Sequence, residues 1–180
     1  RLTEELAHRA AHDELTGLPN RRVLESALSD GLARAMRDDT RVGVCFIDLD
    51  GFKGVNDTLG HGVGDQLLID AATCITASVR EGDVAARVGG DEFVVLLDPV
   101  SSDIDSLSVA RRIRDSVRSC GSTFSATVGF GASVGLALSE PGDTPAALLR
   151  RADDALYRAK ATRDSSIAIA DGGLDGATLV

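Results

Sequence analysis

Apolar residues recur along the chain at spacings that predict alternating helices and strands. Between Arg21 and about Met36 they fall on one helical face, and Asn20 is placed to cap that helix. Residues 42–47 form a continuous apolar run, which is typical of a buried central strand. The same criteria predict further helices at residues 52–59, 64–79, 104–117 and 144–161, and further strands at residues 84–88, 93–97, 124–128, 133–137 and 166–170.

This order of elements predicts an α+β domain of the split βαβ kind, built on a mostly antiparallel sheet. Two tight pairs of strands are expected, the first with Gly89 and Gly90 at its turn. Residues 166–170 are expected to form a final edge strand. The pattern by itself predicts that the helices pack on one face of the sheet.

The two ends of the chain differ from its middle. Residues 1–11 are polar and helical in character, and we interpret residues 1–12 as the end of a signalling helix that arrives from an upstream sensor domain. Residues 171–180 contain Gly172, Gly173 and Gly176, and we interpret them as a tail or a linker, which leaves open a further domain downstream. Residues 13–170 then form the domain itself.

Composition limits the class of partner. The chain has 180 residues, of which 43% are hydrophobic, as expected for one compact domain. A formal net charge of -9 argues against general affinity for a nucleic-acid backbone. With five Phe, one Tyr and no Trp, the chain offers no aromatic platform for single-stranded nucleic acid. We therefore expect no nucleic-acid partner, and any bound phosphate needs local Lys or Arg, or a bridging metal.

Cysteine usage and hydropathy bear on the compartment. Cys45, Cys74 and Cys120 have neither zinc nor redox spacing, and we interpret them as reduced core residues of a cytoplasmic bacterial protein. The longest apolar runs are far shorter than the roughly 20 residues of a spanning helix. No signal-peptide pattern is seen, and we expect no membrane contact from this segment.

Acidic residues stand where the predicted strands end. Asp48 ends the buried strand, where a carboxylate must be paired, hydrogen-bonded or metal-bound, and Asp50, two residues later, projects to the same face. Asp91 and Glu92 form a second acidic pair at the hairpin turn. If the hairpin lies beside the strand, Asp91 approaches Asp48, and carboxylates about 4 Å apart repel unless a cation lies between them.

Such a set of hard oxygen ligands favours Mg²⁺ or Mn²⁺, and a pair of these ions suits nucleotidyl transfer. The alternative is that Asp48 and Asp50 are ordinary solvated turn residues. Gly89 and Gly90 favour the metal interpretation, because two glycines allow a sharp turn and close approach of a ligand.

Several motifs together resemble the GGDEF domain family, in that family's order and spacing, over about residues 13–163. The motifs are Asp13-Glu14-Leu15-Thr16-Gly17-Leu18-Pro19-Asn20-Arg21, Phe46-Ile47-Asp48-Leu49-Asp50-Gly51-Phe52-Lys53, Asn56-Asp57-Thr58-Leu59-Gly60-His61, Gly64-Asp65, Gly89-Gly90-Asp91-Glu92-Phe93 and Tyr157-Arg158-Ala159-Lys160. The resemblance implies a polymerase-palm-like, nucleotidyl-cyclase fold, with a central mostly antiparallel sheet surrounded by helices. It also implies diguanylate cyclase activity, in which two GTP condense to cyclic di-GMP and two pyrophosphates.

The resemblance also implies roles for individual residues. Asp48 and Asp91 ligate the metal ions, with the Leu49 carbonyl assisting. Glu92 is a second-metal ligand or helps to deprotonate the 3′-hydroxyl. Asn56 and Asp65 read guanine, and a carboxylate accepting from guanine N1–H and N2–H gives a basis for preferring GTP over ATP.

The resemblance also implies which residues contact the triphosphate. Lys160 holds the triphosphate, as does Lys53 or the backbone N–H groups around Phe52. The family usually continues, two residues after this lysine, with Gly-Arg-Asn, whereas Ala161-Thr162 is followed here by Arg163-Asp164. This departure leaves open whether Arg163 reaches the phosphates.

An inhibitory product site is implied by the position of Arg80, which precedes Gly89 by the family spacing. Arg80 and Asp83 would bind cyclic di-GMP, since a guanidinium grips phosphate or the guanine O6/N7 edge and a carboxylate takes guanine N–H groups. The alternative is a helix-terminal arginine beside a turn aspartate. A second phosphate contact is expected from one of Arg111, Arg112 and Arg114, among which the sequence does not choose.

The function predicted from the sequence is therefore a magnesium-dependent diguanylate cyclase, active as a homodimer and inhibited by its product. Two alternatives stay open: a catalytically weak regulatory domain that binds GTP or cyclic di-GMP, and another palm enzyme such as a nucleotide cyclase or polymerase.

Overall fold

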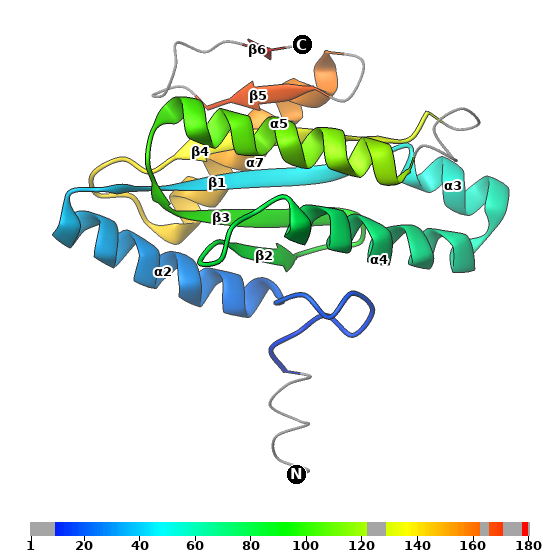
Figure 1. Ribbon diagram of the computed structural model, residues 1–180, viewed down its shortest axis with the longest axis horizontal. Coiled ribbons are helices and arrows are strands. Elements are labelled where there is room, and N and C mark those ends of the chain that lie inside the picture. The colour runs from blue at the N-terminus through cyan, green and yellow to red at the C-terminus, as the bar shows by residue number, and fades with distance from the viewer. Residues whose placement is uncertain (1–9, 122–128, 163–165, 171–177, 180) are drawn as a thin grey trace.

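One sheet organises the chain in the computed structural model, which describes residues 10–121, 129–162, 166–170 and 178–179 (Figure 1). Its strands are β1 (Arg41–Asp50), β2 (Val84–Arg87), β3 (Glu92–Val100), β4 (Gly131–Leu138), β5 (Ile167–Ile169) and β6 (Thr178–Leu179). These described strands form a six-stranded sheet in the order β2-β3-β1-β4-β5-β6. Neighbouring strands are antiparallel except β4 and β5, which are parallel.

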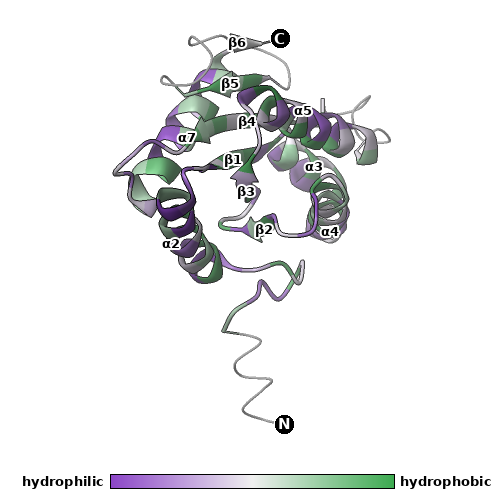
Figure 2. Cartoon of the chain, turned by 60° about the vertical axis from the view of Figure 1, so that its left-hand side comes forward, coloured by the Kyte–Doolittle hydropathy of each residue, from purple (hydrophilic) through white to green (hydrophobic). Residues whose placement is uncertain are grey.

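Helices cover both faces of this sheet. They are α2 (Arg21–Asp38), α3 (Phe52–Leu59), α4 (His61–Ala77), α5 (Asp103–Cys120) and α7 (Pro145–Ala161). Figure 2, which looks along the sheet, shows α2 and α7 on one side and α3, α4 and α5 on the other. The α+β fold with a sheet surrounded by helices is thus confirmed, whereas the expectation of helices on one face is wrong.

The physical reason lies in β1, which is buried along almost all of its length. Ile47 and Leu49 belong to the apolar cluster under α3, α4 and α5, while Val44 and Phe46 belong to the cluster under α2 and α7. Since successive strand residues point to opposite faces, a continuous apolar run has two apolar faces, and each needs its own helical layer.

Most predicted elements lie where the apolar pattern put them, although some limits change. The strand at 42–47 extends over Arg41–Asp50, so it carries Asp48 and Asp50 within it. Residues 166–170 contain β5, but β5 is not an edge strand because β6 pairs with its outer side. The strand expected at 124–128 and residues 1–9 of the N-terminal helix lie outside the described residues, and Ala10 and Ala11 form a turn.

Two glycines shape the connection after β1. Gly51 has φ 77°, a left-handed conformation that turns the chain sharply from Asp50 into α3. Gly60, with φ 88°, ends α3 and precedes α4 directly. α3 therefore starts directly at the end of β1, where the acidic residues stand, and α4 follows α3 without a loop.

The backbone of α7 packs directly against β4. A Cβ atom on Gly135 would lie 2.1 Å from the Ala152 carbonyl oxygen and 2.3 Å from the Leu156 nitrogen. Only glycine permits this contact, and it holds the last turns of α7 near the strand ends.

No helix in the described part of the chain is both long and apolar enough to cross a membrane. The cysteines are all free. Burial raises the pKa of the Cys45 thiol to about 12, as befits an unreactive core residue. Cys74 and Cys120 are only half-buried; burial, and then the neighbouring Cys74 thiol, raise the pKa of Cys120 to about 12.

Candidate active site

The acidic residues of β1 and β3 meet at one end of the central strands. Asp48 is only 8% exposed and stands opposite Glu92 of β3 and Ser133 of β4. Strand alternation directs Asp48, Asp50 and Glu92 to the α2 and α7 side of the sheet. The sequence-based expectation that these acids share one face is confirmed for Asp48 and Asp50.

The glycine turn before β3 is tied to β1 by backbone hydrogen bonds. The Leu49 N–H donates to the Asp91 carbonyl at 3.2 Å, and the Val88 N–H donates to the Glu92 carbonyl at 3.0 Å. This arrangement brings Asp91 beside Asp48, so the predicted convergence of the two acidic pairs is confirmed.

Burial and mutual repulsion raise the pKa values of three carboxyl groups here. For Asp91 the larger cause is burial and the next is the charge of Asp48. Glu92 follows the same order, with Asp153 of α7 adding to the repulsion. Burial also raises the pKa of Asp50, although the Ser133 hydroxyl donates to its two oxygens at 2.8 and 3.1 Å. The site thus carries more negative charge than its own side chains neutralise.

Lys160 supplies the nearby cation. Its Nζ lies 2.7 Å from Asp48 Oδ2, and it projects from the last turn of α7. The Lys160 side chain is thus paired with a carboxylate although 41% of it is exposed. One ammonium group faces several carboxylates, and Asp50, Asp91 and Glu92 keep raised pKa values in its presence.

The donor set fits a magnesium ion that shares its coordination with a ligand. Among the described residues no group of three or more His, Cys, Asp or Glu side chains is arranged to hold a metal by itself. Magnesium commonly takes one or two carboxylates and completes its shell with water and phosphate oxygens. Asp48 and Asp91 match that pattern.

The two residues expected to read guanine are brought together by the α3–α4 connection. Asn56 lies on α3 and Asp65 on the first turn of α4. A Cβ atom on Gly64 would lie 1.9 Å from Asn56 Oδ1, so the amide of Asn56 rests against the backbone just before Asp65. Gly64 therefore lets the Asn56 amide lie against the first turn of α4, which also carries the exposed Asp65.

The residues expected to bind the triphosphate differ in how accessible they are. The Phe52 side chain packs against the core, so only its backbone N–H at the start of α3 is available to a ligand. Lys53 is exposed on the same turn. Arg163 lies outside the described residues.

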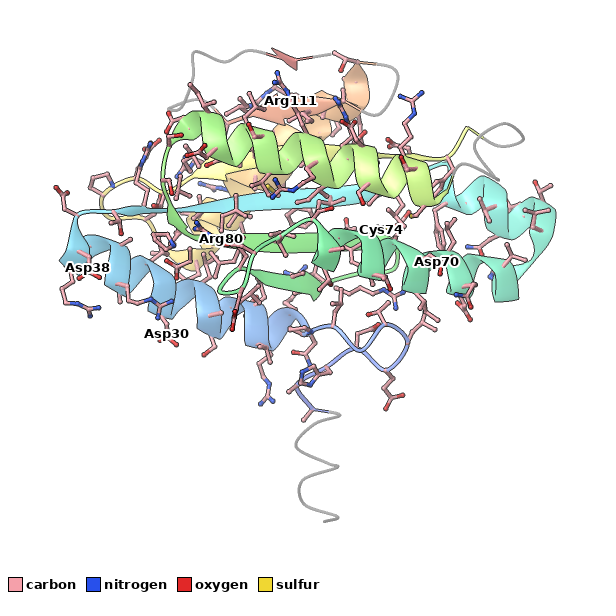
Figure 3. The ribbon with its side chains drawn as sticks, viewed as in Figure 1. Asp30, Asp38, Asp70, Cys74, Arg80 and Arg111 are labelled. Carbon is pink, nitrogen blue, oxygen red and sulfur yellow. The ribbon has the colours of Figure 1, made fainter. Side chains whose placement is uncertain are left out.

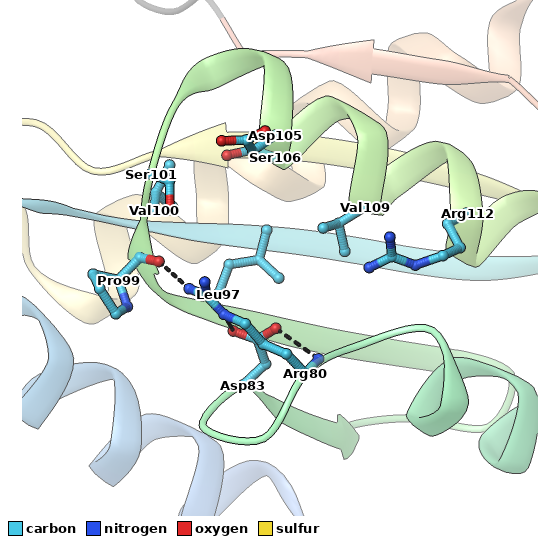
Figure 4. Close-up of a pocket in the computed structure, with 10 residues that line it drawn as sticks. All are labelled: Arg80, Asp83, Leu97, Pro99, Val100, Ser101, Asp105, Ser106, Val109 and Arg112. Atoms are coloured by element: carbon cyan, nitrogen blue, oxygen red, sulfur yellow. Dashed lines mark hydrogen bonds and ion pairs between the residues drawn. The ribbon is translucent and has the colours of Figure 1, made fainter.

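A separate pocket contains the residues expected to bind product (Figure 4). Arg80 Nε donates to Asp83 Oδ1 at 3.4 Å, the Arg80 N–H donates to Asp83 Oδ2 at 3.2 Å, and Arg80 Nη2 donates to the Pro99 carbonyl. Arg112 lines the same pocket, and its Nε donates to the Ser78 carbonyl at 2.8 Å. In Figure 3 Arg111 lies on the other side of α5 from Arg80, and Arg114 pairs with Asp115.

Residues 10–166 match the family model described as "Diguanylate cyclase, GGDEF domain". The chain belongs to the GGDEF domain family. Its signature, Gly89–Phe93, comprises the turn and the first residues of β3, and Phe93 is fully buried.

Relatives and solved structures agree with this assignment. The GGDEF domain is 47% identical over 161 residues to the diguanylate cyclase TpbB of Pseudomonas aeruginosa (strain UCBPP-PA14), covering 86% of this chain and 36% of that protein. The crystal structure of diguanylate cyclase SiaD from Pseudomonas aeruginosa, in complex with its activator SiaC, shares 37% identity at a TM-score of 0.81, over 94% of this chain and 65% of that one.

The coiled coil and GGDEF domain of DgcB from Caulobacter crescentus, in complex with c-di-GMP, has a TM-score of 0.83 at 28% identity, over 94% of this chain and 90% of that one. This chain therefore spans the GGDEF domain, and about a third of the length of TpbB.

Sequence reasoning missed two neighbours of the GGDEF acids. Asp153 lies one heptad before Lys160 on α7, and this spacing was sufficient to place both on the same face. Ser133 gave no signal, because only the pairing of β4 with β1 places its hydroxyl against Asp50.

Proposed function

We propose that this GGDEF domain condenses two GTP molecules into cyclic di-GMP and two pyrophosphates. The observation that carries the proposal is the meeting of Asp48, Asp91 and Glu92 beside Lys160 at one end of the sheet. A cluster of carboxylates with raised pKa values in a nucleotide-binding family suits metal-assisted phosphoryl chemistry.

Asp48 and Asp91, with the Leu49 carbonyl, would hold Mg²⁺ or Mn²⁺. When bound, the ion would neutralise the triphosphate and polarise the α-phosphate. Glu92 stands next to Asp91 and is partly exposed, so it can reach both an ion and a hydroxyl group.

The side chains of the domain would orient the substrate around these acids. Asn56 and Asp65 would hold the guanine edge, while Lys160, Lys53 and the N–H of Phe52 would hold phosphate oxygens. Glu92, whose pKa is raised by burial and then by the charge of Asp48, is suited to accept the 3′-hydroxyl proton. The 3′-oxygen then attacks the α-phosphorus, and pyrophosphate leaves with the electrons of the broken P–O bond.

Each domain has one set of these residues and so would hold one GTP. Forming a cyclic dinucleotide requires two such attacks in opposite directions. We therefore propose an antiparallel homodimer, in which each 3′-hydroxyl faces the α-phosphate held by the partner. An upstream sensor domain is proposed to set how the two domains meet, since TpbB is much longer than this chain.

Incubation with GTP and Mg²⁺, followed by chromatography, tests the proposal. We expect cyclic di-GMP and pyrophosphate from the wild type and at least a hundredfold less from Asp91→Asn and Glu92→Gln. The exposed Asp154→Asn provides a matched control and should keep wild-type turnover. Unconverted GTP would favour a regulatory domain that only binds nucleotide, and a monomeric cyclic nucleotide or a polymer would indicate another palm enzyme.

Product inhibition is proposed to act at Arg80, Asp83 and Arg112. A pocket lined by two guanidinium groups and two carboxylates, Asp83 and Asp105, offers groups that suit the phosphates and guanine edges of cyclic di-GMP. Titration with cyclic di-GMP should inhibit the wild type and Arg111→Ala alike, while Arg112→Ala weakens inhibition about tenfold or more. Equal inhibition of Arg111→Ala and Arg112→Ala would contradict the assignment of Arg112.

A further inference from the structure

One guanidinium group joins the N-terminal loop to the turn that carries the catalytic acids. Arg87 ends β2, and its side chain is only 13% exposed. Its Nη1 donates to Asp13 Oδ1 at 2.9 Å. Its Nε and Nη2 donate to the Gly90 carbonyl at 3.1 and 2.7 Å. A single rigid fork of donors thus links two segments that are far apart in the sequence.

The loop at Asp13 is held in place by hydrogen bonds within it. Asp13 Oδ1 also accepts from the Thr16 N–H at 2.9 Å and from the Thr16 hydroxyl at 2.7 Å. Burial pushes the pKa of Asp13 up, but the hydrogen bonds from Thr16 and Arg87 outweigh it and lower the pKa. The Arg87 N–H donates to the Pro19 carbonyl at 3.0 Å, which attaches the loop to β2 a second time.

The same loop holds the chain that arrives from the N-terminal side. The Asn20 side-chain amide and Arg22 Nη2 each donate to the Ala10 carbonyl at 2.9 Å. The Asn20 backbone N–H donates to the Ala11 carbonyl at 2.9 Å. A displacement of the chain at Ala10 or Ala11 is therefore passed to the loop.

The turn at the other end is held by the Leu49–Asp91 and Val88–Glu92 backbone hydrogen bonds and by the side chain of Arg87. Gly90 is exposed, and a Cβ atom there would meet nothing within 4 Å. A Cβ atom on Gly89 would lie 2.5 Å from Glu92 Oε2, so the Glu92 carboxylate rests directly over the turn. The pairing of Glu92 with Asp48 fixes its backbone, the turn contacts its carboxylate, and the Arg87 side chain ties that turn to the N-terminal loop.

We propose that Arg87 is a positioning residue, which couples the loop Asp13–Asn20 to the turn Gly89–Glu92 and so lets movement of the upstream chain change the placement of Glu92. This inference rests on the proposed catalytic role of that turn. The guanine and triphosphate residues lie on α3, α4 and α7, outside this linkage. Breaking it should therefore lower kcat and leave the KM for GTP nearly unchanged.

Three variants test the linkage kinetically. Arg87→Lys keeps the charge but cannot donate to Asp13 and Gly90 together, and Asp13→Asn keeps the shape but loses the ion pair. We expect kcat to fall about 10- to 100-fold in each, as a shift of about 1 Å in a catalytic group would produce. The KM for GTP should stay within about twofold of the wild type, and the double variant should lose no more than Arg87→Lys alone. Arg34→Lys, in the distant Arg34–Asp98 ion pair, is the matched control and should change neither constant.

Amide hydrogen exchange of the metal-free protein provides a second readout that does not require turnover. Exchange at residues 88–92 should accelerate in Asp13→Asn, although Asp13 does not touch the turn, and should stay unchanged in Arg34→Lys. Unchanged exchange at the turn in both Asp13→Asn and Arg87→Lys, or a rise in KM as large as the loss in kcat, would overturn the proposal. A wild type that makes no cyclic di-GMP refutes the proposed function instead, while the exchange experiment still decides whether the linkage exists.

Discussion

Asp48 carries a negative charge at a position that is only 8% exposed. A buried carboxylate is costly unless it is paired, and Lys160 provides the partner at 2.7 Å. Within the part of the chain that the structure describes, the neighbouring acids Asp50, Asp91 and Glu92 form no ion pair, and their pKa values are raised. At the scale of single residues this cluster of acids therefore costs some stability, which agrees with the cation and phosphate proposed to bind there.

Replacing Lys160 by Met should destabilise the metal-free protein by about 1–2 kcal/mol. The variant leaves Asp48 buried and unpaired, and the loss is smaller than for a fully buried pair because solvent reaches Lys160. Urea unfolding in the presence of a chelator measures the change, with the exposed Lys53→Met as control. Equal losses in the two variants would show that the pair with Asp48 contributes nothing.

The raised pKa of Asp91 predicts that Asp91→Asn increases the free energy of unfolding, and that the increase depends on pH. A carboxyl group whose folded pKa is raised contributes stability below its unfolded pKa, near 3.9, and loses that contribution as pH rises through the folded value. The metal-free variant should therefore exceed the wild type in stability at pH 7.5, by up to about 1 kcal/mol given solvent screening, and by less at pH 4.5. Unfolding curves at both pH values decide this, and a gain that does not grow with pH would contradict it.

At the scale of elements, glycines set how closely the helices approach the site. Gly135 lets the backbone of α7 rest on β4, which holds Lys160 near Asp48. Gly64 lets Asn56 of α3 lie on the first turn of α4, beside Asp65. The turn at Gly51 starts α3 at the end of β1, and Gly60 folds α4 back along α3. Short connections and close helix contacts thus assemble groups from five elements into one site.

Gly64→Ala should impair nucleotide recognition more than folding. The added methyl group would lie 1.9 Å from Asn56 Oδ1, so the amide must move away from its place beside Asp65. We expect the KM for GTP to rise about tenfold and the preference for GTP over ATP to fall. Gly62→Ala, where a Cβ atom meets nothing within 4 Å, is the matched control and should keep the wild-type KM. Steady-state kinetics with ATP as competitor measure both effects, and equal KM values would exclude this role for Gly64.

At the scale of the whole molecule, one sheet with helices on both faces presents its acids at one end of the central strands (Figure 2). The acidic turn, the residues proposed to bind guanine and Lys160 come from separate parts of the chain but lie towards that end. The pocket proposed to bind product lies apart, between β3, α5 and the segment that precedes β2. The proposals thus place synthesis and inhibition in different regions of the same domain.

The proposed homodimer predicts that specific activity depends on protein concentration. Because each domain would hold one GTP, turnover per domain should fall towards zero on dilution below the dimer dissociation constant. Initial rates over a thousandfold range of protein concentration, paired with sedimentation, test this expectation. Constant turnover per domain in a solution shown to be monomeric would refute the dimer mechanism.

The sequence by itself determined the secondary structure closely wherever buried residues recur at the spacing of a helix or a strand. The helix expected at 52–59 is α3 as observed, and the run at 42–47 lies within β1. Asp91 was expected to approach Asp48 only if the hairpin lay beside the central strand, and the pairing of β3 with β1 meets that condition. Local pattern and turn chemistry suffice for the positions of the helices and strands, since both depend on neighbours close in the chain.

Only the tertiary structure decided which faces are covered and which side chains meet across elements. Periodicity shows that a face is buried but not what buries it, so the second helical layer was missed. Successive residues on α5 differ by about 100° in direction, so choosing Arg112 over Arg111 required the orientation of that helix against β3. The link from Asp13 through Arg87 to Gly90 likewise depends on packing between distant segments, which no local spacing encodes.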